Sequence, residues 1–416
     1  MSGALEPAAA SSRRRAFLAV FSSTFFVRFA FGITTAVFAS YITRSTAGIG
    51  QGEVGGVGLV SAMAPVGELA TVLLSGAVAD RYGRFPVLFA GIGGSAVIFA
   101  LKATTRWPLA LGTLNLLFGV ASGAILAASL AVIGDWSGAN ERGFEMGRFD
   151  AMNLFGWVGG FAFGFAALGL VPNSELWFVF AVGAVVLAIG LFSARSLARG
   201  LPPHAAGANY VFRDVLGHVF RRSVLLVTLP WLVIYMLIGT ALIFLGSAAS
   251  GVGVPTELLA GVIAVGGLLL VVTQPYFGRL SDRWGRTRLM TVGAIGFTSL
   301  MIFASLVVAF GARVEILVGL GVSVPAALAY GPAALAALAD LSVEISRATT
   351  MAIYSLSISA GMVLGLVAST GLFAYFGNPG LYLFFGSIAV ALVVLTILRY
   401  RETSLRPEGA LRTPVR

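Results

Sequence analysis

The sequence predicts an all-α integral membrane protein with twelve membrane-spanning helices, and three observations support this prediction. Hydrophobic residues make up 58% of the 416 residues and charged residues only 11%, against ~25% charged residues in a soluble domain. Twelve apolar runs approach or exceed the ~20 residues that a membrane-spanning helix needs. One short charged phrase occurs once in each half of the chain. A chain with so little charge could not cover a soluble surface, so it belongs in a lipid bilayer.

The first apolar run follows three arginines, 13–15, and is interpreted as a membrane span. It is longer than the ~7–15 residues of a signal-peptide core, and no A-x-A cleavage site closes it. The spacing of apolar and polar segments then predicts spans at residues 16–42, 54–79, 85–104, 108–133, 149–170, 175–193, 223–247, 256–280, 288–310, 314–339, 349–376 and 379–398.

The polar segments divide the chain into two sets of six spans. We expect an N-terminal tail at 1–15, a first bundle at 16–193, a central loop at 194–222, a second bundle at 223–398 and a basic, disordered tail at 399–416. The central loop holds Pro202, Pro203 and both histidines, which are expected to be solvated. Most of the 27 basic residues fall on the side of the two tails, and only Arg44, Lys102, Arg106 and Arg313 fall on the other. This bias predicts that both termini are cytoplasmic.

Several classes of function are excluded or disfavoured by what the sequence lacks. There is no cysteine and there are only two histidines, so disulfides and the common metal sites are not expected. No nucleotide-binding loop of the G-x-x-x-x-G-K-[ST] type is present, which argues against ATP-driven transport. The net charge of +10 follows from membrane topology and does not indicate nucleic acid as a partner. We therefore expect neither an enzyme nor a cofactor.

The charged phrase reads G-x-x-x-D-R-[aromatic]-G-R in both halves, at residues 76–84 and 278–286. Its first glycine allows two helices to approach closely, its acid and arginines suit a membrane surface, and its second glycine turns the chain. The residues concerned are Gly76, Asp80, Arg81, Gly83 and Arg84 in the first copy, and Gly278, Asp282, Arg283, Gly285 and Arg286 in the second.

This phrase resembles the loop motif of the major facilitator superfamily (MFS) of secondary transporters, which lies between helices 2 and 3 and again between helices 8 and 9. The family pattern usually continues with a basic residue, where this chain has Phe85 and Thr287; that departure weakens an assignment to the sugar-porter branch. The resemblance implies two six-helix bundles around a central cavity, working by alternating access. It further implies a monomer in a plasma membrane of prokaryotic type, which moves a small-molecule substrate with protons as the coupling ion.

The resemblance also implies a charged latch at the cytoplasmic ends of the helices. Asp135 closes the fourth span and Asp340 closes the tenth. In the family's architecture Arg84 would reach Asp135 with Asp80 beside it, and Arg286 would reach Asp340 with Asp282 beside it. The alternative is that these residues are ordinary surface charges without a mechanical role.

Two further phrases of the family's antiporters are degraded in this chain. The fourth span has Asn115 where an arginine is expected before a G-x-x-x-G run. Within the fifth span, the glycine-rich run from Asn153 to Gly160 lacks the expected proline. Drug efflux by proton antiport is therefore kept as an alternative to transport of another solute. A lipid-handling protein or a sensor that does not transport is the alternative from another class.

Two ionisable residues are expected deep in the bilayer. Counted from Ala16 for Arg28 and from Asp80 for Glu68, both lie roughly 18 Å from the cytoplasmic surface at ~1.5 Å per residue. An unpaired charge there costs at least ~2.5–3.5 kcal/mol, so the two are predicted to form a pair. Burial favours a protonated carboxyl and a nearby arginine favours the carboxylate, so a small rearrangement would change the protonation of Glu68. The pair either couples transport to protons or simply fixes helix packing.

Polar and aromatic residues elsewhere in the spans are candidates to line a substrate cavity, with packing or interface anchoring as the alternative for each. The candidates are Asn115, Asn153, Trp157, Trp231, Tyr235 and Tyr330. The serines Ser355 and Ser359 are instead expected to bond back to their own helix.

Overall fold

The computed structural model describes residues 5–45, 54–138, 141–201, 220–251, 256–311, 313–341 and 347–405, and every regular element in these ranges is helical. The first half forms α1 (Leu5–Ser45), α2 (Val54–Tyr82), α3 (Arg84–Thr104), α4 (Pro108–Trp136), α5 (Arg142–Leu170), the short 3-10 helix η1 (Asn173–Glu175) and α6 (Trp177–Ala198). The second half forms α8 (Arg222–Gly251), α9 (Thr256–Trp284), α10 (Arg286–Phe310), α11 (Val314–Leu328), α12 (Tyr330–Leu341), α13 (Arg347–Phe376) and α14 (Asn378–Leu405).

Membrane helices account for most of this architecture. Within the described residues, ten helical stretches are long and apolar enough to cross a membrane, with α11 and α12 counted as one stretch. The helices α5 and α9 are not among the ten, and α5 carries Arg142, Glu145, Arg148 and Asp150 near its start. The multi-pass, all-helical prediction is therefore confirmed, whereas the count of twelve spans remains a prediction.

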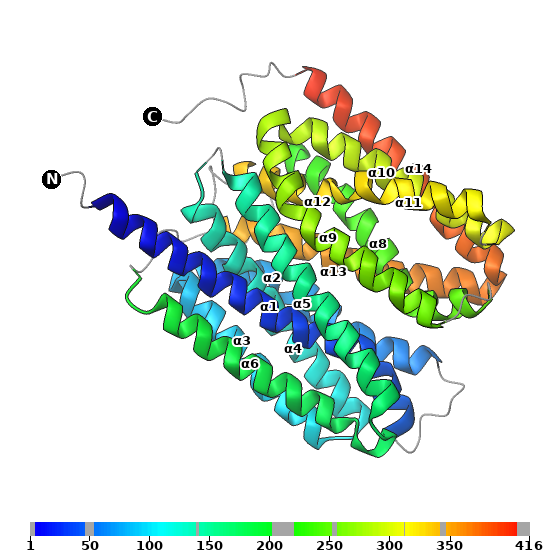
Figure 1. The fold of residues 1–416 in the computed structure, drawn as a ribbon, viewed down its shortest axis with the longest axis horizontal. Helices are drawn as coiled ribbons and strands as arrows, with labels where there is room; N and C mark the ends of the chain where they lie inside the picture. The colour runs from blue at the N-terminus through cyan, green and yellow to red at the C-terminus, as the bar shows by residue number, and fades with distance from the viewer. Residues whose placement is uncertain are drawn as a thin grey trace.

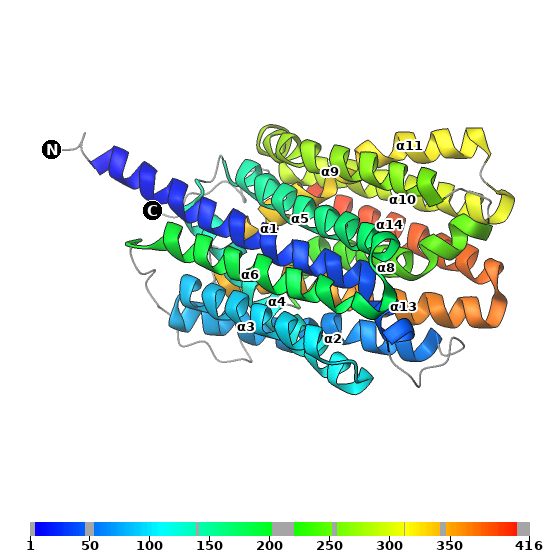
Figure 2. The same ribbon diagram turned by 60° about the horizontal axis from the view of Figure 1, so that its bottom comes forward.

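The two halves of the chain form two groups of helices, α1–α6 and α8–α14 (Figures 1 and 2). The helix α1 begins and α14 ends at the same end of the molecule, which we name the terminal end. The two groups meet along two helix pairs, α5 with α9 and α2 with α13. Each pair joins one helix of each half, so the interface itself has an approximate repeat.

Glycines bring α5 and α9 into close contact. A Cβ atom at Gly147 would lie 2.5 Å from the carbonyl oxygen of Gln274 and 3.1 Å from Cα of Pro275. A Cβ atom at Gly278 would collide with the backbone of Gly143. Gly278 therefore does what its place in the repeated phrase predicts, because only a residue without a side chain permits this helix approach.

The second glycine of each phrase turns the chain between two helices. Gly83 separates α2 from α3 with φ of 98°, and Gly285 separates α9 from α10 with φ of 93°. Positive φ is accessible to glycine at little cost and is strained for other residues. The two copies of the phrase thus form the same turn in each half.

The tenth predicted span is broken at Ala329 into α11 and α12. Pro332 has no N–H to bond to the carbonyl of Leu328, and its ring crowds that carbonyl. The Ala329 N–H instead bonds to the oxygen of Ala326 at 3.2 Å, in a tighter turn. The break leaves Gly331 facing the first half of the molecule, beside the central site described below.

The first and last helices of the chain extend into the segments that were predicted to be tails. The helix α1 begins at Leu5 and α14 ends at Leu405, so parts of 1–15 and 399–416 are helical. Arg13 of the extension bonds to Glu141 at 2.5 Å, and Arg399 is 7% exposed with a contact to Met290. These contacts give the helix ends partners that a disordered tail lacks. The predicted central loop lies largely outside the described residues, with both histidines.

Two clusters of buried apolar side chains form the core. One lies within the first half and includes Ile33, Phe99 and Phe118. The other fills the second half around Trp231 and also contains first-half residues of α1, α4 and α5. The apolar core is therefore continuous across the interface, which supports the polar groups buried there.

Candidate functional site

The first copy of the phrase forms the predicted charge cluster. Arg84 pairs with Asp80 one turn before it, and its Nε donates to Oδ2 of Asp135 at 3.3 Å. Arg84 also donates to the carbonyl of Ala79 at 3.2 Å. All three charged side chains are nearly buried, so the arginine neutralises two carboxylates that would otherwise be costly to desolvate.

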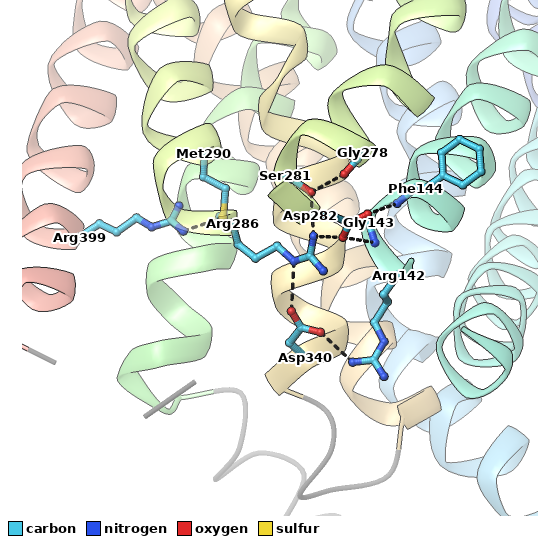
Figure 3. Close-up of polar contacts among 10 residues, drawn as sticks. All are labelled: Arg142, Gly143, Phe144, Gly278, Ser281, Asp282, Arg286, Met290, Asp340 and Arg399. Carbon is cyan, nitrogen blue, oxygen red and sulfur yellow. Dashed lines mark hydrogen bonds and ion pairs between the residues drawn. The ribbon is translucent and has the colours of Figure 1, made fainter. Parts of the chain in front are cut away.

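The second copy repeats this arrangement (Figure 3). Arg286 pairs with Asp282, donates from Nε to Asp340 at 3.2 Å and donates to Oγ of Ser281 at 2.9 Å. The contacts predicted from the sequence for Arg84 and for Arg286 are thus both present.

The second cluster also binds the first half of the molecule, through the start of α5 (Figure 3). The two carboxylate oxygens of Asp282 accept hydrogen bonds from the backbone N–H groups of Gly143 at 3.1 Å and Phe144 at 3.0 Å. Asp340 accepts a hydrogen bond from Nη1 of Arg142 at 2.7 Å. From here on, the name latch is kept for these contacts between the two halves, which join residues 142–144 to Asp282 and Asp340.

The geometry of the latch follows from the chemistry of a helix N-terminus. The first N–H groups of a helix have no partner within it, and they carry partial positive charge. The N-cap residue Glu141 makes no side-chain cap bond to α5. Asp282 therefore supplies the missing cap from the other half, and the two halves are held together at the terminal end.

Three residues of the phrase do not take part in these clusters. Arg81 and Arg283 are exposed, and Arg81 lies over the ring of Tyr82 at 5.4 Å. Gly76 is buried within α2. The charged contacts of the phrase are therefore made by its acids and by the arginine that follows the turn.

Glu68 lies buried where α2 meets α13, with 3% of its surface exposed. Its carboxylate accepts a hydrogen bond from the hydroxyl of Ser355 in α13. The buried hydroxyl of Ser359, one turn further on, faces the same carboxylate. The expectation that these serines bond to their own helix was therefore wrong for Ser355, because a buried acid offers a stronger partner than a helix carbonyl.

Arg28 does not form the predicted ion pair with Glu68. Among the described residues, no contact within 4.0 Å joins the two, although Arg28 is close enough to act on Glu68 electrostatically. Arg28 is 8% exposed, lies over the ring of Phe31 at 5.4 Å and acts on Asp150 in the same way. Asp150 is thus a second carboxylate within electrostatic reach of Arg28, and no ion pair joins Arg28 to either acid among the described residues.

Asp150 is a central residue that the sequence did not single out. It lies in α5 with 5% of its surface exposed, and Asn153 donates to it at 3.5 Å. A Cβ atom at Gly331 would lie 3.0 Å from Asp150 Oδ2 and 3.5 Å from Gln274 Oε1. Asp150 from the first half and Gln274 from the second thus meet at the broken helix.

We name Arg28, Glu68, Asp150, Asn153, Gln274, Tyr354 and Ser355 the central site. These residues come from five helices: α1, α2 and α5 of the first half, and α9 and α13 of the second. Oδ1 of Asn153 and Oε1 of Gln274 are buried without a hydrogen-bond partner in the described chain. Buried polar atoms of this kind need a partner, so they are available to a polar solute.

The aromatic cavity candidates differ in their surroundings. Trp231 contacts Tyr235 at 5.3 Å, Tyr354 at 5.2 Å and Tyr330 at 5.5 Å between ring centroids. Its ring also lies 3.5 Å from the position of a Cβ at Gly331, beside the central site. Tyr330 is fully buried and donates to the carbonyl of Val227 at 3.0 Å, a contact that fits the packing alternative.

Two candidates remain on the first half. Trp157 is half-buried in α5 and stacks on Phe161, with ring centroids 5.4 Å apart. Asn153, one turn before it, belongs to the central site. The remaining candidate, Tyr235, lies in α8 of the second half. It is half-buried beside Trp231 and lies within electrostatic reach of Asp150. The cavity roles of all six candidates, Asn115, Asn153, Trp157, Trp231, Tyr235 and Tyr330, stay as predictions.

Asn115 has a structural partner instead. Its Oδ1 accepts a hydrogen bond from Nζ of Lys102 at 2.9 Å, and its Nδ2 donates to the carbonyl of Val60 at 3.1 Å. Lys102 was counted with the side away from the two tails, near the end of the span 85–104; it is fully buried, and the rings of Phe99 and Phe118 lie 4.9 Å from its ammonium. Aromatic faces attract a cation, which compensates in part for its desolvation.

Lys102→Met is expected to leave stability nearly unchanged, because removal of a buried charge offsets loss of the donor to Asn115 Oδ1. No carboxylate pairs with Lys102 in the described part of the chain, and methionine fills similar space without a buried charge. Asn115→Leu is expected to destabilise the protein by about 1–3 kcal/mol, because it leaves a buried ammonium without its acceptor. Thermal unfolding in detergent measures both. In the double variant the loss should largely vanish, and additive effects would contradict this account.

Taken together, these features define a helical membrane protein of two related bundles, with charged groups buried where the bundles meet. A family model of the Major Facilitator Superfamily matches residues 20–331 and 256–414. The chain therefore belongs to the Major Facilitator Superfamily, a family of transporters, as its repeated phrase indicates.

One characterised relative is the tetracycline resistance protein, class B, of Escherichia coli. It is 26% identical over 242 residues, which are 56% of this chain and 58% of that protein. The match thus spans less than two thirds of the relative's length.

Solved structures share the fold along nearly the whole chain. The human organic anion transporter MFSD10 (TETRAN) superposes with a TM-score of 0.74 at 16% identity, over 93% of this chain and 99% of that one. The proton:xylose symporter XylE gives 0.72 at 15% identity, over 94% and 95%. The transporter FucP in its outward conformation gives 0.72 at 14% identity, over 93% and 99%. At these identities the likeness shows the fold alone.

Proposed function

We propose that this chain is a secondary active transporter that moves a small solute across a plasma membrane of prokaryotic type, with protons as the coupling ion. In this proposal twelve spans cross the bilayer, both termini are cytoplasmic and the functional unit is a monomer. The terminal end then faces the cytoplasm, as the excess of basic residues on that side favours. The solute binds at the central site.

The observation that carries the proposal is the imbalance of charge in the central site. One arginine, Arg28, acts on two buried carboxylates, Glu68 and Asp150. With both acids ionised the site has one uncompensated negative charge. A proton or a cationic group of a solute would neutralise it, and in a buried site the two would compete.

The position of Glu68 links this competition to movement of the two halves. Its carboxylate is held by Ser355 of the second half. Protonation weakens a charge-assisted hydrogen bond of this kind, so it loosens the contact of α2 with α13. A change of protonation in the central site thereby alters the relative free energy of the closed and open arrangements, as alternating access requires.

The latch sets which side is closed in the arrangement seen here. Its contacts hold α5 to α9 and α12 at the terminal end, so in this proposal that end is the closed one. In the opposite arrangement these contacts would break, and the freed N–H groups of α5 would bind water. The latch is thus a mechanical element of the proposed cycle.

The substrate class follows from the same imbalance. The central site favours a cationic solute, or an apolar solute exchanged for protons, over a carboxylate. Trp231 and Tyr235 beside it supply aromatic faces of the kind that bind cations. Drug efflux is the second candidate function, supported by the relation to a tetracycline resistance protein. Lipid handling and sensing without transport remain the alternatives of another class.

Flux into proteoliposomes under an imposed pH gradient tests the proposal. We expect accumulation of a lipophilic cation that carboxylates do not inhibit. Exclusive transport of carboxylates would overturn the substrate class, and transport indifferent to the pH gradient would overturn proton coupling. A sensor would bind a solute without moving it, and a lipid-handling protein would move only lipid analogues.

A further inference from the structure

A cavity of about 910 Å³ opens at the terminal end, between α1 and α5 of the first half and α9 of the second. Five arginines and three acids line it. It lies beside the latch, because Asp282 forms part of its wall. It is separate from the central site, with which it shares no residue.

The acids of this cavity already have partners. Asp282 is held by Arg286 and by the N-terminus of α5, as described above. Glu141 pairs with Arg13 at 2.5 Å, and Glu145 pairs with Arg148 at 3.1 Å. The carboxylates of the wall are therefore not available to the remaining arginines.

Three arginines are left over. Arg14, Arg279 and Arg283 are exposed, and none of them forms an ion pair within the part of the chain that the structure describes. Arg279 lies over the ring of Phe144 at 4.1 Å, which orients its guanidinium along the cavity wall. Guanidinium groups bind phosphate by paired hydrogen bonds, so three of them in one cavity fit a phosphate group.

Apolar side chains of α1 continue the cavity wall beyond Arg14. Leu18 follows Arg14 by one turn and is 40% exposed, and the nearly buried Phe17 and Phe21 lie beside it. These side chains offer nothing to a free inorganic anion but can contact the glycerol and upper acyl carbons of a lipid. Basic cavities between membrane helices on the cytoplasmic side suit anionic headgroups.

We propose that this cavity binds the headgroup of an anionic phospholipid, with its phosphate at Arg14, Arg279 and Arg283 and its apolar part against Leu18. The lipid then contacts α1 and α9 at once and joins the two halves beside the latch. A ligand that binds only one arrangement stabilises that arrangement. The lipid therefore favours closure of the terminal end. The effect on closure rests on the proposed function, whereas the binding itself does not.

Native mass spectrometry of protein from nanodiscs tests the binding. With phosphatidylglycerol, the wild-type protein is expected to retain lipid, and the variant Arg279→Gln/Arg283→Gln to bind it roughly 30-fold more weakly, at ~1 kcal/mol per arginine. The matched control is Arg195→Gln/Arg199→Gln, two exposed arginines of the same end that lie outside the cavity. The control should retain lipid as the wild type does.

Equal retention by the Arg279→Gln/Arg283→Gln variant and the wild type would overturn the proposal. So would inorganic phosphate that displaces phosphatidylglycerol and binds equally well in phosphatidylcholine nanodiscs, since the site would then be one for a soluble anion. Both measurements need no transport activity. Lipid binding can therefore be scored even if the protein proves not to be a transporter, and the two failures can be told apart.

Discussion

Glu68→Gln is expected to abolish accumulation of substrate in response to a pH gradient while energy-independent exchange of substrate continues. Glutamine keeps the size of the side chain and can still bond to Ser355, but it cannot take up or release a proton. Position 68 would stay permanently neutral, so a pH gradient could no longer act through it. Proteoliposome flux measures both modes: uphill uptake under a pH gradient, and exchange of labelled for unlabelled substrate without one.

Ser355→Ala is the matched control for Glu68→Gln. It removes the bond between the halves but retains the carboxylate, so uphill transport should persist with an altered rate. If Glu68→Gln still concentrates substrate, coupling belongs to another group, and Asp150→Asn is the next variant to measure. Equal loss in Glu68→Gln and Ser355→Ala would favour a static contact that only fixes packing. So would failure of Glu68→Gln to fold, scored by thermal unfolding.

Asp282→Asn is expected to open the terminal end and to lower transport strongly. The change removes the negative charge that pairs with Arg286 and weakens both bonds to the start of α5. Hydrogen bonds to a charged group contribute about 1.5–3 kcal/mol each, so the closed arrangement should lose at least tenfold in population. Spin labels at positions 82 and 284 report it, since both side chains are exposed and the chain has no cysteine.

Asp80→Asn, the equivalent change in the first half, should lower transport and shift the same distance distribution toward the open arrangement. Glu315→Gln is a control, since Glu315 is an exposed acid at the start of α11, outside both charge clusters. It should leave the distribution and the flux unchanged. If Asp282→Asn does the same, the latch has no mechanical role.

Much of the fold follows from local properties of the sequence. Apolar length predicts the helices, and the repeated phrase predicts the turns at Gly83 and Gly285, because each depends only on residues close in the chain. The clusters of Arg84 and Arg286 were also predictable, but only through the resemblance that places their partners nearby. The break at Ala329 could have been predicted from Pro325 and Pro332, which lie on either side of it.

The centre of the molecule was less predictable, because its contacts join distant segments. Arg28 and Glu68 were identified as buried charges, yet the sequence could not show that Asp150 shares the arginine. Asp150 stands at the edge of a predicted span, next to charged residues, where an acid looks like part of a loop. Gln274 is an uncharged residue in an apolar run and gives almost no signal. Ser355 appears ordinary until Glu68 is placed opposite it.

The latch has a further consequence for how the protein tolerates change. On the α9 side the contact depends on one carboxylate, so substitutions at Asp282 that remove the charge are damaging. On the α5 side it is made by the backbone of residues 143 and 144, which every amino acid except proline provides. Position 143 is instead limited by volume, since a Cβ there would lie 2.6 Å from Ser281 Oγ. One partner is thus constrained by chemistry and the other by size, and a lost carboxylate cannot be compensated by any charge placed at position 143.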